Sequence, residues 1–319
     1  MSPFTRQRSR SIAALGESKL ISEISRWLGS ASPKSPRGIG DDCAVLSGTP
    51  RDQLITVDPV IYGEHFDDRI PARGVGAKLF NRNLSDIAAM GGRPRAVVIA
   101  LATSKDLKVE WLRDFYRGIA NLARRYSVPV IGGDVAHQPT GFTATMTMMG
   151  EAKKKRLVTR SNAKVGDWIF VTGRLGGSRL EWHWKFTPRL AEGQWLGKRA
   201  EVHAMMDISD GLGKDLLALQ PKGTRIALSR ETIPVSKSAR QYSETSGEAP
   251  LFHALTDGED YELVFAVSGR TKPKEFIAEW HRHFKGPLTC IGRFVKTRAV
   301  SPYPDELDLN EFPGFEHLR

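Results

Sequence analysis

Apolar residues recur along this chain at two spacings, one typical of helices and the other of strands. Helices are expected over 17–28, 74–90, 109–126, 211–219 and 273–284. Strands are expected over the following ranges: 43–46, 53–57, 96–101, 128–131, 142–149, 167–172, 224–228, 261–267 and 288–291. Because strands and helices alternate in both halves, we expect an α/β or α+β fold.

Two of the predicted helices differ in what lies on their surfaces. In 74–90, Lys78, Arg82 and Asp86 recur every four residues, which places Asp86 on a polar helical face rather than in a loop. In 109–126, aromatic and apolar residues form a stripe at helical spacing, and we interpret this stripe as core packing.

A basic connector at 151–164 divides the chain into two parts. We expect an N-terminal domain at 16–150 and a C-terminal domain at 151–319. Residues 1–15 carry three arginines but no apolar run, so we expect a disordered basic tail and no secretory signal.

The composition is that of a soluble globular protein with an excess of basic residues. The 47 Lys and Arg residues against 36 Asp and Glu residues give a net charge of +11. Apart from 153–156 the basic residues are scattered, which favours anionic small substrates over nucleic acid as the main partner. Cys43 and Cys290 cannot form a zinc site between them and indicate a reducing compartment, so we expect the cytoplasm. No apolar run reaches the roughly 20 residues of a membrane span.

Acidic residues gather in six places, most of which adjoin glycine or a turn. These places are Gly40-Asp41-Asp42, Asp58, Ser85-Asp86, Gly132-Gly133-Asp134, Asp207-Ile208-Ser209-Asp210 and Gly258-Glu259-Asp260. Grouped carboxylates repel one another and raise each other's pKa unless cations join them. Mg²⁺ prefers such oxygen ligands and bridges one or two carboxylates to the phosphates of a substrate. The clusters therefore indicate magnesium and nucleotide chemistry.

The cluster at 207–212 is the most informative of these. Asp207 and Asp210 can hold metal on one turn, and the start of a helix after them would attract phosphate. The simpler interpretation is a helix cap by Ser209 or Asp210, which uses only one of the polar residues. The glycines of Gly132-Gly133-Asp134, at the end of a predicted strand, would let the backbone approach a phosphate.

Other catalytic motifs are missing from the sequence. It has no Walker A Gly-x-x-x-x-Gly-Lys-Ser/Thr and no clear Gly-x-Gly-x-x-Gly after a predicted strand. It also lacks Gly-x-Ser-x-Gly and His-Glu-x-x-His. These absences argue against a P-loop enzyme, a dinucleotide-binding enzyme, an α/β-hydrolase and a zinc protease of the usual type.

Taken together, the ordered motifs resemble the thiamine-monophosphate kinases of the aminoimidazole-ribonucleotide-synthetase-like superfamily. The resemblance runs from residue 16 to the C-terminus. The matching segments are Gly38–Leu46, Asn83–Gly91, Gly132–Asp134, Thr159–Ser161, Gly166–Ile169, Asp207–Leu212 and Gly258–Leu263. So many motifs in the right order make the resemblance specific for the superfamily.

The resemblance implies ATP-dependent phosphorylation of thiamine monophosphate to the diphosphate, by direct in-line transfer with several Mg²⁺ ions. The metal ligands that it implies are Asp42, Thr56, Asp58, Asp86, Asp134, Asp207 and Asp210, of which Asp42 and Asp210 would be catalytic. The implied ATP contacts are Gly133, Asp134, Arg160 and Ser209, and the implied contacts to the thiamine end are His65, Glu259 and Phe312. It also implies a homodimer whose N-terminal halves share a β-barrel, an α/β C-terminal half, and no membrane or nucleic-acid partner.

The sequence departs from the family pattern at three places. Val57 follows Thr56 where a hydroxyl is usual, Val135 and Ala136 replace hydroxyls, and 177–206 is short. These changes bear on metal affinity and substrate fit more than on the reaction class.

Several alternatives stay open. A sibling such as aminoimidazole-ribonucleotide synthetase would use ATP on another acceptor, although Ser85–Gly91 and Gly258–Leu263 favour the kinase. A selenophosphate synthetase would need a reactive Cys or selenocysteine with a nearby Lys in the N-terminal arm, and the sequence has neither. A non-catalytic nucleotide-binding relative or a basic RNA-associated protein is the alternative from a different class.

Overall fold

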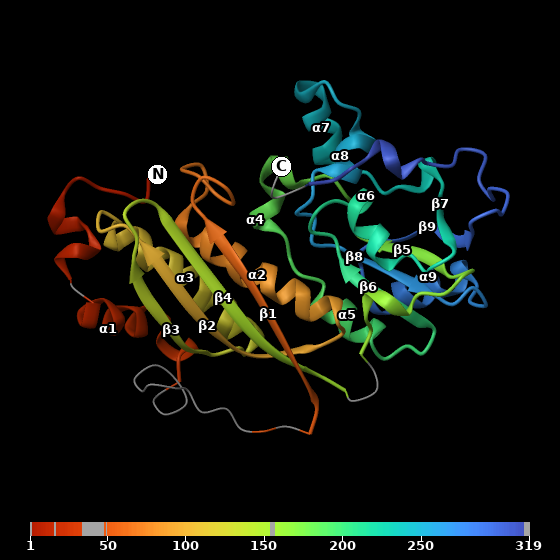
Figure 1. Cartoon of the computed structure of the whole chain (residues 1–319). Helices are drawn as coiled ribbons and strands as arrows, with labels where there is room; N and C mark the ends of the chain where they lie inside the picture. Colours follow the sequence, from red (N-terminus) through yellow and green to blue (C-terminus); the bar gives the residue numbers. More distant parts are fainter. Residues whose placement is uncertain (1, 16, 34–47, 49, 154–156, 316–319) are drawn as a thin grey trace. The chain divides into compact units, whose positions relative to one another are not determined.

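The chain divides into two units in a computed structural model that describes residues 2–15, 17–33, 48, 50–153 and 157–315 (Figure 1). The first unit comprises residues 1–87 and 93–154, and the second comprises 88–92 and 155–319. Each unit has its own sheet. The predicted strand at 43–46 and the predicted ligand Asp42 lie outside the described residues.

The first unit is built on a four-stranded sheet in the order β1-β4-β2-β3. Its strands are β1 (Asp52–Ile61), β2 (Arg93–Thr103), β3 (Val130–His137) and β4 (Phe142–Ala152). β4 is antiparallel to β1 and β2, whereas β2 and β3 are parallel and are joined by α3 (Val109–Tyr126). Figure 1 shows α2 (Ala72–Ala89) and α3 on one face of this sheet, and α1 (Glu17–Leu28) packs against α3. As far as the chain is described, the sheet is open and forms no barrel.

The helix predictions for this unit are confirmed within two residues at each end. In α3, Trp111, Phe115 and Ile119 are buried. The rings of Trp111 and Phe115 lie 5.0 and 5.3 Å from the ring of Phe142 on β4. The aromatic stripe is therefore core packing, as predicted, and Asp86 lies within α2 rather than in a loop.

The Gly-Gly-Asp segment lies inside β3 and not after a strand, so this part of the prediction was wrong. Gly133 and Asp134 pair with Ile99 and Ala100 of β2. A Cβ on Gly133 would lie 2.1 Å from the carbonyl oxygen of Ile99. The missing side chain at Gly133 therefore lets two strand backbones approach each other, which the sequence of β3 alone could not indicate.

The N-terminal segment has local structure in place of the expected disorder. It forms two short 3₁₀ turns, η1 (Arg8–Arg10) and η2 (Ile12–Ala14). The Thr5 amide donates to the carbonyl oxygen of Asp106, and the ring of Phe4 lies 5.3 Å from that of Tyr62. Backbone pairing and one aromatic anchor hold this arm against the first unit.

The second unit is built on a five-stranded antiparallel sheet in the order β6-β8-β5-β9-β7. Its strands are β5 (Trp168–Thr172), β6 (Val202–Asp207), β7 (Thr224–Leu228), β8 (Leu263–Val267) and β9 (Leu288–Lys296). The predicted strands at 167–172, 224–228, 261–267 and 288–291 are confirmed. β9 extends five residues beyond its predicted end, because its last residues pair with β7.

Both faces of this sheet are covered. Ile169 and Val171 of β5 belong to one buried cluster with residues of α6 (Leu212–Asp215) and its 3₁₀ extension η6 (Leu216–Leu219). Phe170 belongs to the opposite cluster, which includes residues of α5 (Leu190–Leu196) and α9 (Pro273–His283). The alternation along β5 therefore gives a layer on each side of the sheet.

Shorter elements complete the two units. The helices α7 (Lys237–Ser246) and α8 (Pro250–Thr256), like α5 and the short α4 (His183–Lys185), were not indicated by the sequence. The remaining turns are η3 (Gly29–Ala31), η4 (Arg160–Asn162), the π-helical turn η5 (Ser178–Trp182), η7 (Arg230–Thr232) and η8 (Leu309–Glu311). None of the helices within the described ranges is long and apolar enough to cross a membrane.

The contact between α2 and α3 yields a stability prediction. A Cβ on Gly118 of α3 would lie 2.2 Å from the carbonyl oxygen of Arg73, and one on Gly76 of α2 would lie 2.1 Å from that of Phe115. We expect Gly118→Ala to lower the free energy of unfolding by about 1–3 kcal/mol, because the helices must move apart. Urea denaturation measures this change.

The matched control is Gly132→Ala in the same unit. A Cβ there would meet only the Val98 side chain, at 3.6 Å. We expect this control to unfold close to the wild type. Equal unfolding midpoints for Gly118→Ala and the wild type would contradict the account of the helix crossing.

Candidate functional site

Polar side chains of β1 and α2 meet in the first unit. Thr56 and Asp58 alternate on β1 and therefore share a face, and Arg82 and Asp86 are one turn apart on α2. The Thr56 hydroxyl hydrogen-bonds Asp86 Oδ2, and Arg82 Nη2 lies 3.2 Å from Asp58 Oδ1. We call these four residues the β1–α2 polar cluster.

The partnership of Arg82 with Asp58 was missed by the sequence analysis. Arg82 was placed only on the polar face of a helix, and Asp58 only among metal ligands. Arg82 also donates to the carbonyl oxygen of Pro59 at 2.8 Å. The two residues are 24 positions apart, so the helical spacing of Arg82 and Asp86 was the only available signal.

Asp134, the remaining predicted ligand among the described residues of this unit, lies elsewhere on the sheet. β1 and β3 are opposite edges with two strands between them, which separates them by roughly 14 Å at ordinary strand spacing. Thr56 pairs with the buried Met148, whereas Asp134 pairs with the exposed Ala100. Asp134 is therefore on the other face, and one chain does not bring it to the β1–α2 polar cluster.

His65 lies in the turn after β1. Its Nδ1 accepts from the amide of Ile61 at 3.3 Å. The ammonium group of the fully buried Lys78 donates to the backbone oxygen of His65 at 2.8 Å. This turn is thus fixed to α2, and a role of His65 at the thiamine end stays a prediction.

Two loops lie side by side at one end of the second sheet. Asp207 is the last residue of β6, and it pairs with Leu263 of β8. Beyond this pair, the amide of Glu259 donates to the oxygen of Ser209, and the amide of Tyr261 donates to that of Ile208. The backbone bonds therefore bring the Asp207–Asp210 segment and the Glu259 loop together.

Asp215 organises the first of these loops. Its Oδ2 accepts from the amides of Ser209 and Asp210, at 2.8 and 2.9 Å. The pKa of the Asp215 carboxyl is raised to about 7, mainly because the group is buried. The two bound amides lower this pKa, and the charges of Asp210 and Asp207 raise it. The carboxylate of Asp210 lies 2.9 Å from Lys214 Nζ.

The alternative interpretation of this segment, a helix cap by Ser209 or Asp210, was wrong. Gly211, with φ of 100°, is the N-cap residue of α6, and it has no side chain to cap with. The α-helical part has only four residues before the 3₁₀ turn, so we assign no phosphate site to its start. The side chain of Asp215, inside the helix, instead accepts from the amides of Ser209 and Asp210 themselves.

The Glu259 loop has an unusual backbone. Glu259 and Tyr261 have positive φ angles of 54° and 52°, which residues with side chains seldom adopt. Between them, the buried carboxylate of Asp260 accepts from the amides of Gly176 and Gly177. Such strain persists only where surrounding contacts fix it, and it is typical of functional loops.

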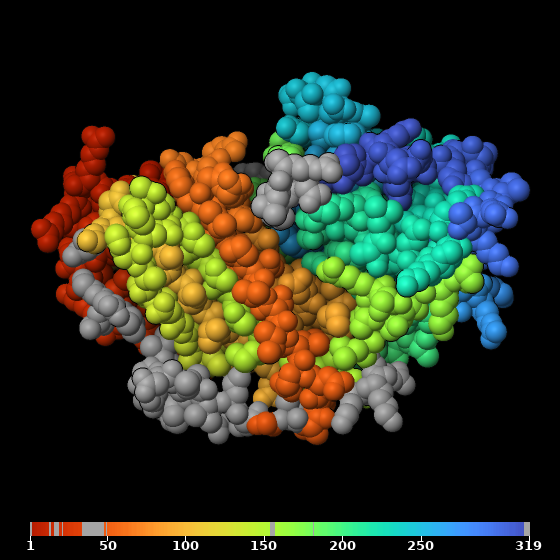
Figure 2. Space-filling view, viewed as in Figure 1, coloured from red at the N-terminus to blue at the C-terminus, as the bar shows by residue number. Residues whose placement is uncertain are grey.

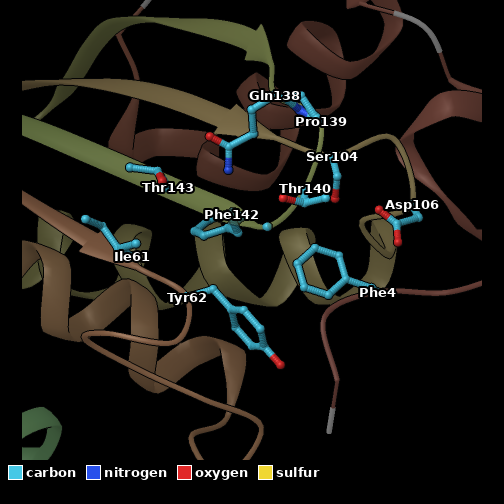
Figure 3. A pocket seen from close by; sticks show the side chains of 11 residues that line it. Phe4, Ile61, Tyr62, Ser104, Asp106, Gln138, Pro139, Thr140, Phe142 and Thr143 are labelled. Carbon is cyan, nitrogen blue, oxygen red and sulfur yellow. The ribbon is translucent and has the colours of Figure 1, made fainter.

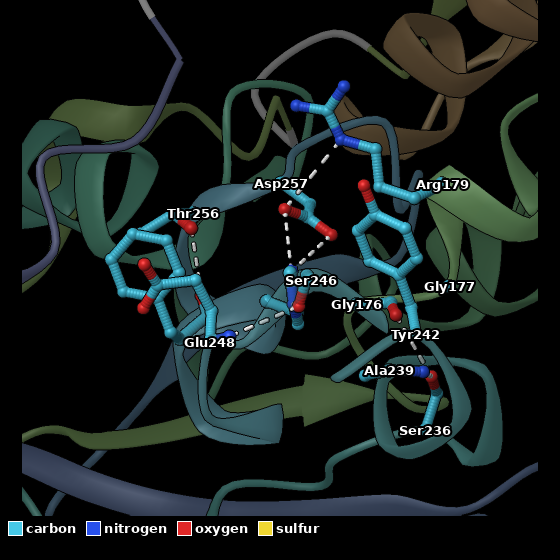
Figure 4. A network of polar contacts seen from close by, with 12 residues as sticks. Gly176, Gly177, Arg179, Ser236, Ala239, Tyr242, Ser246, Glu248, Thr256 and Asp257 are labelled. Carbon is cyan, nitrogen blue, oxygen red and sulfur yellow. Dashed lines mark hydrogen bonds and ion pairs between the residues drawn. The ribbon is translucent and has the colours of Figure 1, made fainter. Parts of the chain in front are cut away.

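A polar network supports the start of this loop (Figure 4). His253 Nδ1 lies 3.0 Å from Asp257 Oδ2, and its Nε2 lies 2.7 Å from the Ser246 hydroxyl. Arg179 Nε lies 3.8 Å from the Asp257 carboxylate. The Ser246 oxygen also accepts from the amide of Glu248, so we interpret the network as a tie between α7, α8 and the loop.

The two remaining predicted residues differ in exposure. Arg160 lies in η4 and is exposed. Phe312 is buried in the core of the second unit, with its ring 6.2 Å from that of Phe252. Their roles toward ATP and the thiamine end stay predictions.

A cavity of about 520 Å³ lies in the first unit (Figure 3). Its lining includes the rings of Phe4, Tyr62 and Phe142 together with Asp106 and Gln138. None of the metal, ATP or substrate contacts predicted from the sequence lines this cavity.

The oxygen donors fit magnesium in kind. In the described part of the chain, no group of three or more His, Cys, Asp or Glu side chains is arranged to hold a metal ion. Mg²⁺ does not need such a cage, because it keeps several waters and takes one or two carboxylates plus substrate phosphates. Asp86 with the Thr56 hydroxyl, and Asp207 with Asp210, are donor sets of that kind.

Comparison with known proteins first shows which broad class the chain resembles, that of the AIR synthase related proteins. Residues 40–152 match the family model described as AIR synthase related protein, N-terminal domain. The fold agrees, since the structure of a thiamine-monophosphate kinase from Stenotrophomonas maltophilia K279a superposes with a TM-score of 0.75 at 27% identity, over 90% of this chain and 97% of that one.

The particular family follows from closer relatives. Thiamine-monophosphate kinase of Rhodopirellula baltica is 36% identical over 275 residues, which cover 82% of this chain and 84% of that protein. A structure of AaThiL complexed with AMPPCP and TMP has a TM-score of 0.69 at 28% identity, and covers 96% of this chain and all of that one. This chain belongs to the thiamine-monophosphate kinase family.

The burial of Asp215 yields a prediction on pH. The pKa of Asp215 is about 7 in the folded protein against an ordinary value of 3.8, so the unfolded chain releases this proton first as pH rises. This carboxyl therefore lowers the stability of the metal-free protein progressively from about pH 4 to about pH 7. We expect Asp215→Asn to lose less stability than the wild type over that range, as measured by urea unfolding without divalent metal.

The exposed Asp308 offers the control, as Asp308→Asn. The control should follow the wild-type pH profile. If Asp215→Asn also followed it in parallel, the burial of a proton on Asp215 would be refuted.

Proposed function

We propose that this protein transfers a phosphate from ATP to thiamine monophosphate in the presence of Mg²⁺ and yields thiamine diphosphate. Membership of the family supports the reaction class. The observation that carries the proposal for this chain is the loop pair that holds Asp207, Ser209, Asp210 and Glu259 at one end of a sheet. The cytoplasmic location, which we predict from the two cysteines, fits such an enzyme.

Phosphoryl transfer depends mainly on positioning and charge neutralisation, and the loop pair suits both tasks. Asp207 and Asp210 would hold magnesium, which when bound neutralises charge on the transferred phosphate. Asp215 fixes the backbone of Ser209 and Asp210 through two amides, so this segment keeps its form before substrate binds. Preorganisation of this kind lowers the reorganisation needed in the transition state. For the transfer itself we propose a direct in-line reaction between ATP and thiamine monophosphate.

The second substrate would meet the strained loop. Glu259 has a positive φ, and the neighbouring Asp260 anchors this backbone to Gly176 and Gly177. We assign Glu259 and His65 to the thiamine end, and Arg160, Gly133 and Ser209 to ATP. For Phe312 we propose that an edge of its ring, rather than the whole side chain, meets the substrate, since the residue is largely buried.

We also propose a homodimer that closes the first sheet into a barrel. On the face without α2 and α3, Ile55 and Val57 of β1 are 73% and 59% exposed. Figure 2 shows side chains of β1 and β4 at the surface on this side. Two open sheets related by a twofold axis would bury these residues, and a β1 edge beside a partner's β3 edge would approach Asp134 of the partner subunit.

Activity measurements test the reaction. With ATP and Mg²⁺, we expect turnover of thiamine monophosphate and none of thiamine or of the aminoimidazole-ribonucleotide precursor. Asp210→Asn should lower kcat about 100-fold or more, since it removes charge aimed at the phosphates. Glu275→Gln, a change on the exposed side of α9, is the control and should keep wild-type rates.

Two results would contradict this assignment. Wild-type rates in Asp210→Asn would remove the metal role of that carboxylate. Turnover of the aminoimidazole precursor, without turnover of thiamine monophosphate, would favour the sibling enzyme.

Light scattering on a sizing column tests the dimer. We expect the wild type at about twice the chain mass and the double variant Ile55→Lys with Val57→Lys at the chain mass of 35.4 kDa, because buried lysines would carry unpaired charge. Leu217→Lys, at a similarly exposed site in the second unit, is the control and should leave the dimer intact. A monomeric wild type, or a dimeric double variant, would rule out this interface.

A further inference from the structure

We propose that Arg82 sets the metal affinity of the β1–α2 polar cluster, because it neutralises Asp58 in the place where a magnesium ion would otherwise bind. This inference rests on the proposed Mg²⁺-dependent function and deepens it. It divides two carboxylates that the resemblance treats alike: Asp86 serves the metal, and Asp58 serves the arginine.

The geometry of the cluster separates the two carboxylates. Asp86 meets a neutral hydroxyl, that of Thr56, which can itself coordinate magnesium through its oxygen. Asp58 instead meets a guanidinium, which has no lone pair to offer a metal. One carboxylate is therefore joined to a possible co-ligand and the other to a competing cation.

Arg82 is well held in this position. Its guanidinium contacts Asp58 Oδ1 through Nη2 and the oxygen of Pro59 through Nη1. The side chain is only 11% exposed, and that of Asp58 is 23% exposed. An arginine keeps its charge at any working pH, so the cation beside Asp58 is not lost by titration.

Charge repulsion turns this contact into a constraint on metal binding. Magnesium coordinates carboxylate oxygen at about 2.1 Å, whereas Arg82 Nη2 already lies 3.2 Å from Asp58 Oδ1. A divalent ion on the same oxygen would lie within about 5 Å of a unit positive charge. Even at the dielectric constant of water, that repulsion weakens binding on the order of tenfold.

Binding of Mn²⁺ alone to the nucleotide-free, full-length protein tests this role, with electron paramagnetic resonance to count free Mn²⁺. We expect Arg82→Gln to bind Mn²⁺ about tenfold more tightly than the wild type at one site. Adding Asp58→Asn to that variant should remove the gain, because Asp58 is then no longer the released ligand. Asp86→Asn should weaken the site in both backgrounds.

Arg95→Gln is the matched control. It breaks another ion pair of the first unit, between Arg95 and Glu151 at 3.0 Å. Its Mn²⁺ affinity should equal that of the wild type. A gain in this control as large as that of Arg82→Gln would mean that any lost positive charge suffices, and would overturn the specific role.

A purely structural role for Arg82 gives a different pattern. If the ion pair only fastens β1 to α2, Arg82→Gln lowers the free energy of unfolding and leaves Mn²⁺ affinity unchanged, which overturns the proposal. Asp58→Asn alone decides the matter if Arg82→Gln does not fold. We expect its Mn²⁺ affinity to stay within about twofold of the wild type, and a tenfold loss would show that Asp58 binds metal beside Arg82.

The Mn²⁺-binding test of Arg82 does not depend on catalysis. If the protein failed to phosphorylate thiamine monophosphate but Arg82→Gln gained Mn²⁺ affinity, the role of Arg82 would stand and the proposed function would fall. If the kinase reaction were found and Mn²⁺ affinity were indifferent to Arg82, only the further inference would fail.

Discussion

Repulsion between neighbouring carboxylates is the constraint on which both units of this chain depend. Each acidic residue near a candidate site needs a partner that offsets its charge. Asp58 has Arg82, Asp210 has Lys214, and the buried Asp215 accepts from two amides and has a raised pKa. The proposed magnesium would be a further partner for Asp86, Asp207 and Asp210, whereas Asp58 keeps Arg82.

Contacts between residues far apart in the sequence bring the parts of each candidate site together. In the first unit, the sheet face that carries Thr56 and Asp58 lies against α2. On this helix, Asp86 lies one turn beyond Arg82. In the second unit, adjacent strands β6 and β8 end in the two loops, and backbone hydrogen bonds lock these loops together. A strained Glu259 is the local cost of that arrangement.

Local patterns in the sequence predicted the elements well and their partners poorly. The helical face with Asp86 and the aromatic stripe of α3 follow from spacing alone, and both are confirmed. The Gly-Gly-Asp segment was misplaced because the approach of Ile99 to Gly133 depends on a neighbouring strand. The contact between Arg82 and Asp58, and the capture of two amides by Asp215, likewise depend on tertiary structure and left no distinct pattern in the sequence.

Phosphorus NMR of the wild-type protein with ATP and thiamine monophosphate tests the central claim most directly. The account predicts that thiamine diphosphate resonances grow with those of ADP when Mg²⁺ is added, and that chelation of the metal stops both. Loss of ATP to ADP and inorganic phosphate, with thiamine monophosphate left unchanged, would contradict it.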